Sequence, residues 1–338
     1  MAESTRVSFD ELKKIFLEKL VKHGVGEDEA EKTAGIFALN AADGIMTHSV
    51  ERFPRLIRQI DDGVSFPGRV PELVASFGAI EKYDACLGLG TTSASLSMDR
   101  AEALASEYGI GLVALRNASH WMRAGYYALS AAEKGFVGIC WTNTMHNLPA
   151  WGSCEANIGN NPVSMAVPRE DGKHFLIDSA MSQFSVGKIS QSAEKGVRLP
   201  VAGGYDRDGN LTDNPSEILA SWRLIPAGFW KGSGFSILLD AMASILSDGK
   251  TVSEIGNCDA VHEAGLSQVF IAVDYRKLGN DPSERVLSSI EDSLRNAARV
   301  NEKNSVRYPG ENLKSIREKS IRDGMTVSSR IMDEINSL

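Results

Sequence analysis

Two short stretches of the chain combine a histidine with arginines at a spacing that acid–base and anion-binding chemistry can use. In the first, DGIMTHSVERFPR, His48 is followed by Arg52 four residues later and by Arg55 three residues after that. A histidine has a pKa near neutrality and can donate a proton to a reacting oxygen. A guanidinium can hold a carboxylate through two parallel hydrogen bonds. The stretch is therefore either an ordinary solvated turn or the acid/base and anion-binding pair of an active site.

The second stretch, NASHWMRAGYY, contains His120 and Arg123 directly after an apolar segment that predicts a buried strand. Loops at strand ends are where α/β proteins tend to bind their ligands. A histidine there is more often structural than catalytic, but the nearby Asn117 and Arg123 weigh toward a site. Another expected strand ends at Asp178, whose carboxylate needs a partner if it is buried. A histidine whose orientation the carboxylate sets would be such a partner.

No other motif in the sequence assigns a chemistry. The glycine-rich candidates for a nucleotide site are Gly88-Leu-Gly90 and Gly232-Ser-Gly234, and neither continues to G-x-G-x-x-G or to a P-loop. We expect Gly88 and Gly90 to be turn glycines ahead of a helix. The sequence also lacks H-E-x-x-H, a carboxylate–histidine cluster at metal spacing and G-x-S-x-G. The motifs thus argue against a Rossmann dinucleotide site, a metal site and a hydrolase.

The elements that must position these residues are predicted to be helices at both ends of the chain and an α/β centre. The first 63 residues show helical spacing, and His48 falls at the edge of a third helix that we expect to begin near Ser49. The four-residue spacing would then project His48 and Arg52 from one helical face. After about Pro282 the pattern is helical again. The expected strands are 73–77, 111–116, 137–141, 163–167, 175–178 and 269–274, and the helices among them 91–108, 122–134 and 233–247.

The composition limits the classes of function. The chain has 338 residues, 43% of them hydrophobic, which is enough for a large core. Its net charge of −8 argues against nucleic acid as a partner, because an acidic surface repels phosphate backbones. Four scattered cysteines without a C-x-x-C pair indicate a reducing compartment. No segment has the character of a secretory signal or a membrane span. We therefore expect a cytoplasmic protein with no membrane partner.

Several longer stretches resemble one known family over essentially the whole chain. They are RFPRLIRQIDDG, GIGLVALRNASHWMRAGYY, AAEKGFVGICWTN, LPVAGGYDRDGNLT and GFWKGSGFSILLD. The chain is similar in these stretches to the malate/L-lactate dehydrogenase-like family of nicotinamide oxidoreductases. The loop HWMR is similar to the subgroup that reduces 2,3-diketo-L-gulonate. The resemblance implies an α/β fold that is not a Rossmann fold, with a largely antiparallel sheet surrounded by helices and a helical region built from both chain termini.

The same resemblance implies how the chain is divided and assembled. Residues 1–72 would form an N-terminal helical region carrying the acid/base histidine, and residues 73–282 the core that binds cofactor and substrate. Residues 283–338 would form C-terminal helices that pack with the N-terminal region. Two subunits would form a homodimer with shared active sites, and the partner molecule would be a small keto acid.

Carried over position by position, the resemblance assigns roles to individual residues. His48 would protonate the substrate carbonyl as hydride reaches its carbon, and Arg52 would hold the substrate carboxylate. Asp178 would lie close to the nicotinamide and orient His48 or relay its proton. The further substrate-binding positions would be Thr47, His120, Arg123 and Asn161. The cofactor-binding positions would be Ile177, Asp178, Ser179, Ala180, Met181, Ser182, Gln183, Trp230, Lys231, Gly310, Glu311 and Asn312.

Four positions depart from the family's pattern. Ser49 adds a side chain directly after the acid/base histidine, where the usual motif Ser-His-Gly has a glycine. Asn160 replaces a common threonine, and Glu311 replaces a histidine in the third cofactor segment. Met145-His146-Asn147 replaces small apolar residues near the expected pocket. The change at Ser49 bears on the surroundings of the acid/base histidine, and the change at Glu311 bears on contacts with the adenosine end of the cofactor.

The resemblance implies NAD(P)H-dependent reduction of a small 2-keto or diketo sugar acid, first of all 2,3-diketo-L-gulonate to 3-keto-L-gulonate. NAD(H) is favoured as cofactor, with NADP(H) as the second option. The departures leave malate, L-lactate, ureidoglycolate or a cyclic imino acid open as alternative substrates. A binding protein that has lost catalysis is the third alternative, against which His48, Arg52, Asp178 and His120 together argue.

Overall fold

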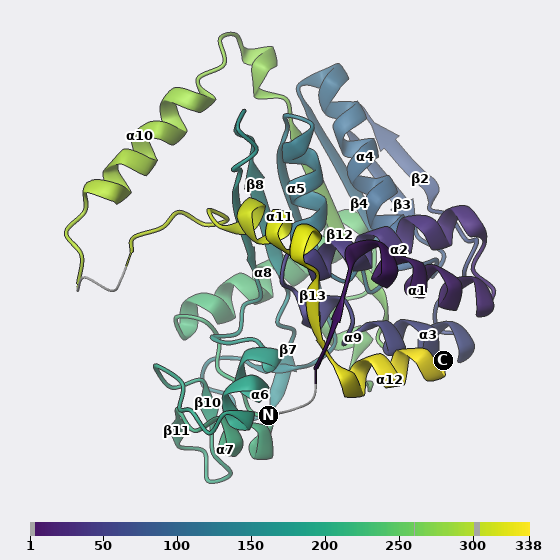
Figure 1. Ribbon diagram of the computed structural model, residues 1–338. Helices are drawn as coiled ribbons and strands as arrows, with labels where there is room; N and C mark the ends of the chain where they lie inside the picture. The colour runs from purple at the N-terminus through teal and green to yellow at the C-terminus, as the bar shows by residue number, and fades with distance from the viewer. Residues whose placement is uncertain (1–3, 260, 301–304) are drawn as a thin grey trace.

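A seven-stranded sheet forms the centre of the computed structural model, which describes residues 4–259, 261–300 and 305–338 (Figure 1). In spatial order its strands are β2 (Glu72–Phe77), β3 (Ile80–Asp84), β4 (Ile110–Ser119), β12 (Ala264–Val273), β5 (Val137–Thr142), β8 (Val163–Val167) and β9 (Phe175–Ser179). Neighbouring strands are antiparallel except for β3 and β4, which are parallel. This topology confirms the expected α/β fold with a largely antiparallel sheet.

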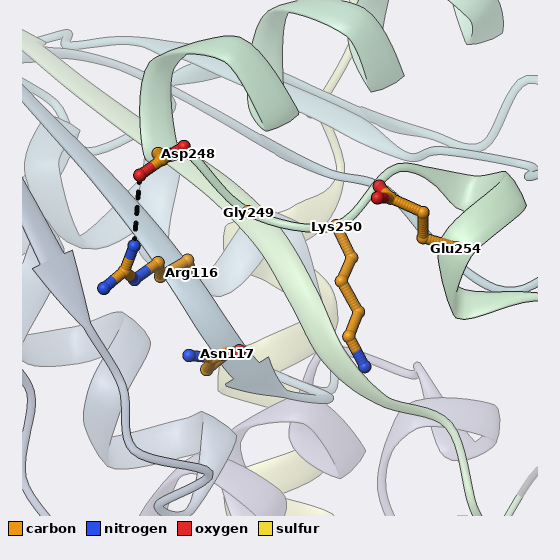
Figure 2. Close-up of a pocket in the computed structure, with 6 residues that line it drawn as sticks. All are labelled: Arg116, Asn117, Asp248, Gly249, Lys250 and Glu254. Atoms are coloured by element: carbon orange, nitrogen blue, oxygen red, sulfur yellow. Dashed lines mark hydrogen bonds and ion pairs between the residues drawn. The ribbon is translucent and has the colours of Figure 1, made fainter.

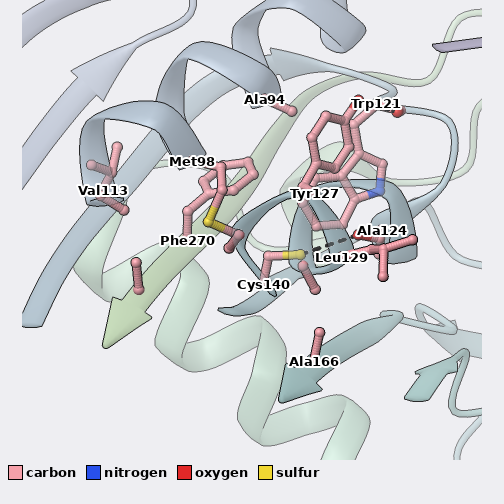
Figure 3. Close-up of a cluster of buried hydrophobic side chains, with 14 of the residues drawn as sticks. Ala94, Met98, Val113, Trp121, Ala124, Tyr127, Leu129, Cys140, Ala166 and Phe270 are labelled. Carbon is pink, nitrogen blue, oxygen red and sulfur yellow. Dashed lines mark hydrogen bonds between the residues drawn. The ribbon is translucent and has the colours of Figure 1, made fainter. Parts of the chain in front are cut away.

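Helices cover both faces of this sheet. They are α4 (Gly90–Tyr108) and α5 (Ala124–Glu133) on one face and α8 (Trp230–Ser247) on the other. Along β4, Val113 packs beneath α4 and α5, whereas its neighbour Ala114 faces α8, because successive side chains of a strand point to opposite faces. On the α4 and α5 side, the rings of Trp121, Tyr127 and Phe270 pack against one another in the main core (Figure 3).

The two ends of the chain pack together beside the sheet. Their strands β1 (Ser4–Val7) and β13 (Met325–Ser328) pair antiparallel. The helices that share a buried core with them are α1 (Phe9–Lys22), α2 (Glu27–Ala42), α3 (Phe53–Asp61) and α12 (Ser329–Ser337). The rings of Phe16, Phe37 and Phe53 form the centre of this core, with centroids 4.4 to 5.6 Å apart. The C-terminal helix α12 thus packs on the N-terminal helices, while the boundaries expected at residues 72 and 282 stay a prediction.

A smaller lobe with its own core extends from the other end of the sheet (Figure 1). It contains β6 (Leu148–Pro149), β7 (Ala156–Ile158), α6 (Val186–Glu194), β10 (Gly204–Tyr205), β11 (Leu211–Thr212) and α7 (Pro215–Ser221). The remaining elements are α9 (Val252–Ile255), η2 (Tyr275–Leu278), α10 (Ser283–Asn296) and α11 (Leu313–Asp323). None of the helices that the structure describes is long and apolar enough to cross a membrane.

The carboxylate of Asp43 joins the N-terminal helices to the core and to α11. Asp43 follows α2 directly and is 4% exposed. Arg123 donates to it from Nη1 at 2.5 Å, and Arg317 of α11 donates from Nε and Nη2 at 2.6 and 3.0 Å. Removing one member of a buried ion-pair group is costly, because the charges left behind lose their compensation.

The structure corrects the expected outline in two places. α3 begins at Phe53 and not near Ser49, and Pro54 occupies its first turn, where no amide hydrogen is needed. His48 lies instead in the short 3-10 turn η1 (Met46–His48). The chain termini, which were expected to be helical, also contribute the strands β1 and β13.

We expect Asp43→Asn to lower the free energy of unfolding by about 3 kcal/mol, because Arg123 and Arg317 lose their shared counter-charge. Urea denaturation followed by circular dichroism measures this change. The exposed pair of Arg198 and Asp213 supplies the control, since Asp213→Asn should leave the denaturation midpoint nearly unchanged. Equal losses in the two variants would contradict the role assigned to Asp43.

Candidate active site

A tight turn, and not one helical face, brings His48 and Arg52 together. In η1 the His48 amide donates to the Ile45 carbonyl at 3.3 Å, and the Arg52 amide then donates to the Ser49 carbonyl at 2.8 Å. The side-chain amide of Asn40, from α2, donates to the His48 carbonyl at 3.2 Å. Arg52 is the residue that precedes α3. His48 and Arg52, four residues apart, are thus brought together by a turn. The expectation that they project from one helical face is wrong.

The His48 imidazole lies near the Thr47 hydroxyl and the ring of His120. Its Nδ1 is 3.2 Å from Thr47 Oγ1. The two imidazole centroids are 6.2 Å apart, and their planes are inclined by 17°. Burial, and then the positive charges of nearby arginines with Arg52 foremost, lower the pKa of His48 to about 3. The imidazole is therefore neutral at physiological pH in the ligand-free chain.

The backbone holds His120 in one tautomer. Its Nδ1 accepts a hydrogen bond from the Met122 amide at 3.0 Å, so the proton of the neutral ring resides on Nε2. Burial, and then the charge of Arg52, keep the pKa of His120 well below its usual range. Gly90 packs directly on this loop, because a Cβ there would come within 2.3 Å of the His120 carbonyl oxygen. This close approach explains the glycine at the start of α4.

Arg52 presents a guanidinium that hydrogen-bonds to no side chain in the described part of the protein. Its side chain is 21% exposed, and Glu263 Oε2 lies 3.7 Å from its Nη2, beyond hydrogen-bonding distance. Its Nε is buried and finds no acceptor among the described residues. Burial, together with the charge of Arg55, lowers the pKa of Arg52 to about 10. Arg52 thus remains a cation at neutral pH and can receive an anion.

Arg55 and Glu263 form a buried ion pair next to Arg52. Arg55 Nη2 donates to Glu263 Oε2 at 2.9 Å, and their side chains are 13% and 5% exposed. The second carboxylate oxygen of Glu263 accepts from the Met145 amide at 3.2 Å. The sequence assigned no role to Arg55, and Glu263 was missed because a lone glutamate before a strand carries no motif. Through Met145, the divergent segment 145–147 reaches the site.

Asp178, on β9, finds its partner in Arg123 and not in a histidine as expected. Arg123 Nε donates to Asp178 Oδ2 at 3.0 Å, while its Nη1 is bound to Asp43. The arginine is 5% exposed. Gly125 leaves the space for this pair, because a Cβ there would come within 2.5 Å of Asp178 Oδ2. Arg123 therefore supports Asp178 from the core, and its direct contact with substrate stays a prediction.

Asn161 and Ser49 are tied into the framework around the site. The Asn161 side chain accepts from the Thr144 amide at 3.0 Å and donates to the Ser236 carbonyl at 2.9 Å. With the residue 1% exposed, these bonds use both ends of its amide. The Ser49 hydroxyl is buried and donates to the Phe37 carbonyl of α2 at 2.6 Å. The extra side chain after His48 is thus accommodated by a hydrogen bond to α2.

Two of the expected cofactor segments meet beyond β9, which is the last strand of the sheet. Ile177 is 46% exposed on this strand. Past its end, the Gln183 amide donates to the Ile225 carbonyl at 2.9 Å, and the Gly228 amide donates to the Gln183 side chain at 3.1 Å. These bonds bring residues 177–183 against the beginning of α8, where Trp230 is 67% exposed.

The third expected segment, residues 310–312, lies at the other end of β9. The Leu176 amide donates to the Pro309 carbonyl at 2.9 Å. Gly310 fits closely there, since a Cβ would come within 2.8 Å of the Leu176 nitrogen. The carboxylate of Glu311 is paired with Arg295, and its Oε2 is buried without a partner among the described residues. The edge strand β9, the exposed ring of Trp230 near one of its ends and the orphaned Glu311 Oε2 near the other fit an extended dinucleotide.

A polar hollow lies apart from these residues, past the end of α8 (Figure 2). It is lined by Arg116, Asn117, Asp248, Gly249, Lys250 and Glu254. Arg116 donates to Asp84 at 3.0 Å and to Asp248 at 3.2 Å, and Asn117 also donates to Asp84, at 2.8 Å. Asn117, which had weighed toward a site at His120, thus belongs to this separate group.

We expect His48 to make the protein less stable as the pH falls below about 6.5, since only the unfolded chain then protonates it. The unfolded state binds the extra proton, so acid favours unfolding, by up to about 2 kcal/mol between pH 6.5 and 5. His48→Gln should lose correspondingly less stability over this interval in urea denaturation. Parallel pH curves for the two proteins would contradict a buried, neutral His48.

Comparison with known proteins places this geometry in a family. The sequence pattern of the malate/L-lactate dehydrogenase family matches residues 7–336. A 2,3-diketo-L-gulonate reductase of Klebsiella pneumoniae is 43% identical over 334 residues, covering 98% of this chain and all of the relative. The malate dehydrogenase of Pyrococcus horikoshii shares the fold with a TM-score of 0.87 at 26% identity, over 100% of this chain and 96% of the other.

The sulfolactate dehydrogenase of Methanocaldococcus jannaschii superposes equally well, with a TM-score of 0.87 at 26% identity over 98% and 96% of the two chains. Dehydrogenases of this kind exchange hydride with a nicotinamide cofactor. The family pattern matches nearly the whole chain, and the similarity to the 2,3-diketo-L-gulonate reductase extends equally far. The chain therefore belongs to the malate/L-lactate dehydrogenase family of oxidoreductases.

Proposed function

We propose that the protein reduces a small 2-keto acid, with a nicotinamide dinucleotide as hydride donor. The guanidinium of Arg52, which hydrogen-bonds to no side chain among the described residues and lies beside the neutral imidazole of His48, supports this most strongly. A carboxylate held by Arg52 would carry the adjacent keto group toward the histidine. Because a relative is named 2,3-diketo-L-gulonate reductase, the first substrate to test is 2,3-diketo-L-gulonate, which would be reduced to 3-keto-L-gulonate.

The reduction adds hydride to the carbonyl carbon and a proton to its oxygen. A dinucleotide bound along β9, by residues 177–183, Trp230, Lys231 and residues 310–312, would supply the hydride. His48 donates the proton as negative charge develops on the oxygen. His120 offers its Nε2 hydrogen to a neighbouring substrate oxygen. Asp178, which lies on β9 and is held by Arg123, would stand close to the nicotinamide and orient His48 or relay its proton.

Substrate binding also accounts for how a histidine with so low a pKa becomes an acid. Burial is the largest cause of the low pKa of His48, and the charge of Arg52 is the next. A substrate carboxylate on Arg52 brings a negative charge that offsets this cause and raises the pKa of His48. The imidazole then takes up a proton when a ketone is present to receive it. Proton loading is thereby coupled to binding.

A second candidate function is the same chemistry on another acid, namely malate, L-lactate, ureidoglycolate or a cyclic imino acid. The divergent segment 145–147, which contacts Glu263, favours keeping this alternative. Initial rates with a panel of 2-keto acids, each with NADH and with NADPH, separate the candidates. We favour NADH, because the Glu311 carboxylate in the third cofactor segment would repel the additional phosphate of NADPH.

We further propose that the protein is a cytoplasmic homodimer. One stripe of α8 is apolar and open to solvent in the single chain, with Phe235, Leu238 and Ile245 exposed by 63%, 60% and 78%. A contiguous apolar patch of this kind is typical of an interface. A second copy covering it would bring the interface close to Trp230 and to a shared active site. Free cysteines fit a reducing compartment.

Two variants separate the roles of the acid and the anion-binding residue. His48→Ala should lower kcat by about 10²- to 10⁴-fold, because the developing alkoxide loses its proton donor. Arg52→Met should chiefly raise KM for the keto acid, by about 100-fold, because the carboxylate loses its counter-charge. Steady-state kinetics measure both effects, and NADH titration by fluorescence should show unchanged cofactor binding. Normal turnover in His48→Ala would show that the proposed acid role is wrong.

A single charged substitution on α8 tests the proposed homodimer. Light scattering after size exclusion should give two chains for the wild type and one chain for Ile245→Glu, because the carboxylate cannot be buried unpaired in an apolar interface. Val201→Glu, at an exposed apolar position of the smaller lobe, is the matched control and should remain a dimer. A monomeric wild type would contradict the proposed homodimer.

A further inference from the structure

The charges around His48 divide into two groups with different balances. The first group holds Asp178 in place, and in it two guanidiniums meet three carboxylates; its members are Arg123, Arg317, Asp43, Asp178 and Glu133. The second group, in which two guanidiniums meet one carboxylate, consists of Arg52, Arg55 and Glu263. Of these two ion-paired groups, only the second has positive charge in excess, and within the group it amounts to one unit.

Glu263 is fixed so that it cannot leave this second group easily. Its two carboxylate oxygens accept from Arg55 and from the Met145 amide, and its backbone carbonyl accepts from the Gln59 side chain at 3.4 Å. The side chain is 5% exposed. Its Oε2 therefore stays 3.7 Å from Arg52 Nη2, beside the position where an anion on Arg52 would bind.

We propose that Glu263 selects substrates by charge, so that the site accepts monoanionic 2-keto acids and rejects dianionic ones. The proposal rests on the proposed function, in which Arg52 holds the substrate carboxylate. One carboxylate neutralises the excess charge of Arg52, Arg55 and Glu263. A second would lie in a partly buried site next to Glu263, where like charges repel far more strongly than in water. The other guanidiniums near His48, Arg55 and Arg123, are already bound to carboxylates.

The test compares two keto acids that differ in one charge, 2-oxoglutarate and its 5-methyl ester, with NADH and the full-length protein. The wild type should prefer the ester in kcat/KM. Glu263→Gln, which keeps the shape and removes the charge, should reduce this preference at least about tenfold, mainly by lowering KM for 2-oxoglutarate. Glu263→Asp should retain the preference. Glu155→Gln, an exposed carboxylate elsewhere, is the control and should match the wild type.

A charge-balanced double variant separates charge from packing. In Arg55→Gln/Glu263→Gln the excess returns to one unit, on Arg52 alone, so the preference for the ester should return toward that of the wild type. A merely structural Glu263 predicts the opposite, with the double variant further impaired on both acids. This comparison also serves if Glu263→Gln alone fails to fold.

The outcomes distinguish the two proposals. If the wild type reduces neither 2-oxoglutarate nor its ester nor 2,3-diketo-L-gulonate, the proposed function is wrong. Charge selection by Glu263, which rests on that function, is then wrong as well. A wild type that reduces the ester contradicts charge selection alone if it reduces 2-oxoglutarate equally well. An unchanged preference in Glu263→Gln contradicts it too.

Discussion

The buried carboxylate of Asp43 is the interaction on which the arrangement of the site depends. It receives Arg123 from the core and Arg317 from α11, and it stands at the end of α2, where the chain turns into η1. Arg123 extends the same group of charges to Asp178 on the edge strand. One carboxylate therefore relates the turn that carries His48 to the strand along which a dinucleotide would lie. The N-terminal helices, the sheet and α11 are thus joined through this one charge.

Among these guanidiniums, Arg52 differs in that it hydrogen-bonds to no side chain of the described residues and has only Glu263 as a more distant ion-pair partner, at 3.7 Å. Arg55 and Arg123, which also lower the pKa of His48, each donate to a carboxylate. An uncompensated guanidinium in a partly buried place is costly unless a ligand completes it. Arg52 lies next to a neutral histidine, so an anionic keto acid bound there would offset its charge and raise the pKa of His48. In the proposed mechanism, binding, orientation and protonation then depend on the same charge.

Local patterns in the sequence predict six of the seven strands of the central sheet and miss β3, Ile80–Asp84. They also fail where tertiary contacts decide the structure. The apolar run at β8, Val163–Val167, coincides with the expected strand. The start of α3 was misplaced, because the side chain of Asn40 and the turn at Ser49 determine it. The pairing of β1 with β13 joins the two chain ends, which no local periodicity reveals.

In the site, too, residue types and local spacing were informative, whereas contacts between distant segments were not predictable. The types and spacing of His48 and Arg52 suggested acid–base chemistry, and the family resemblance selected it over a solvated turn. Glu263 lies 208 residues from Arg55, with which it pairs, and only the fold brings them together. The partner of Asp178 was likewise predicted to be a histidine, while the fold supplies Arg123. The aspartate at the end of a strand indicated that Asp178 needs a partner, but not that this partner is Arg123.

In the proposed mechanism substrate charge is coupled to the protonation of His48, and proton uptake on binding tests this coupling directly. Isothermal titration of the enzyme–NADH complex with oxamate, a monoanionic keto-acid analogue, is repeated near pH 7 in buffers of different ionisation enthalpy. Binding should take up close to one proton in the wild type and none in His48→Gln. Binding without proton uptake in the wild type, or equal uptake in both proteins, would contradict it.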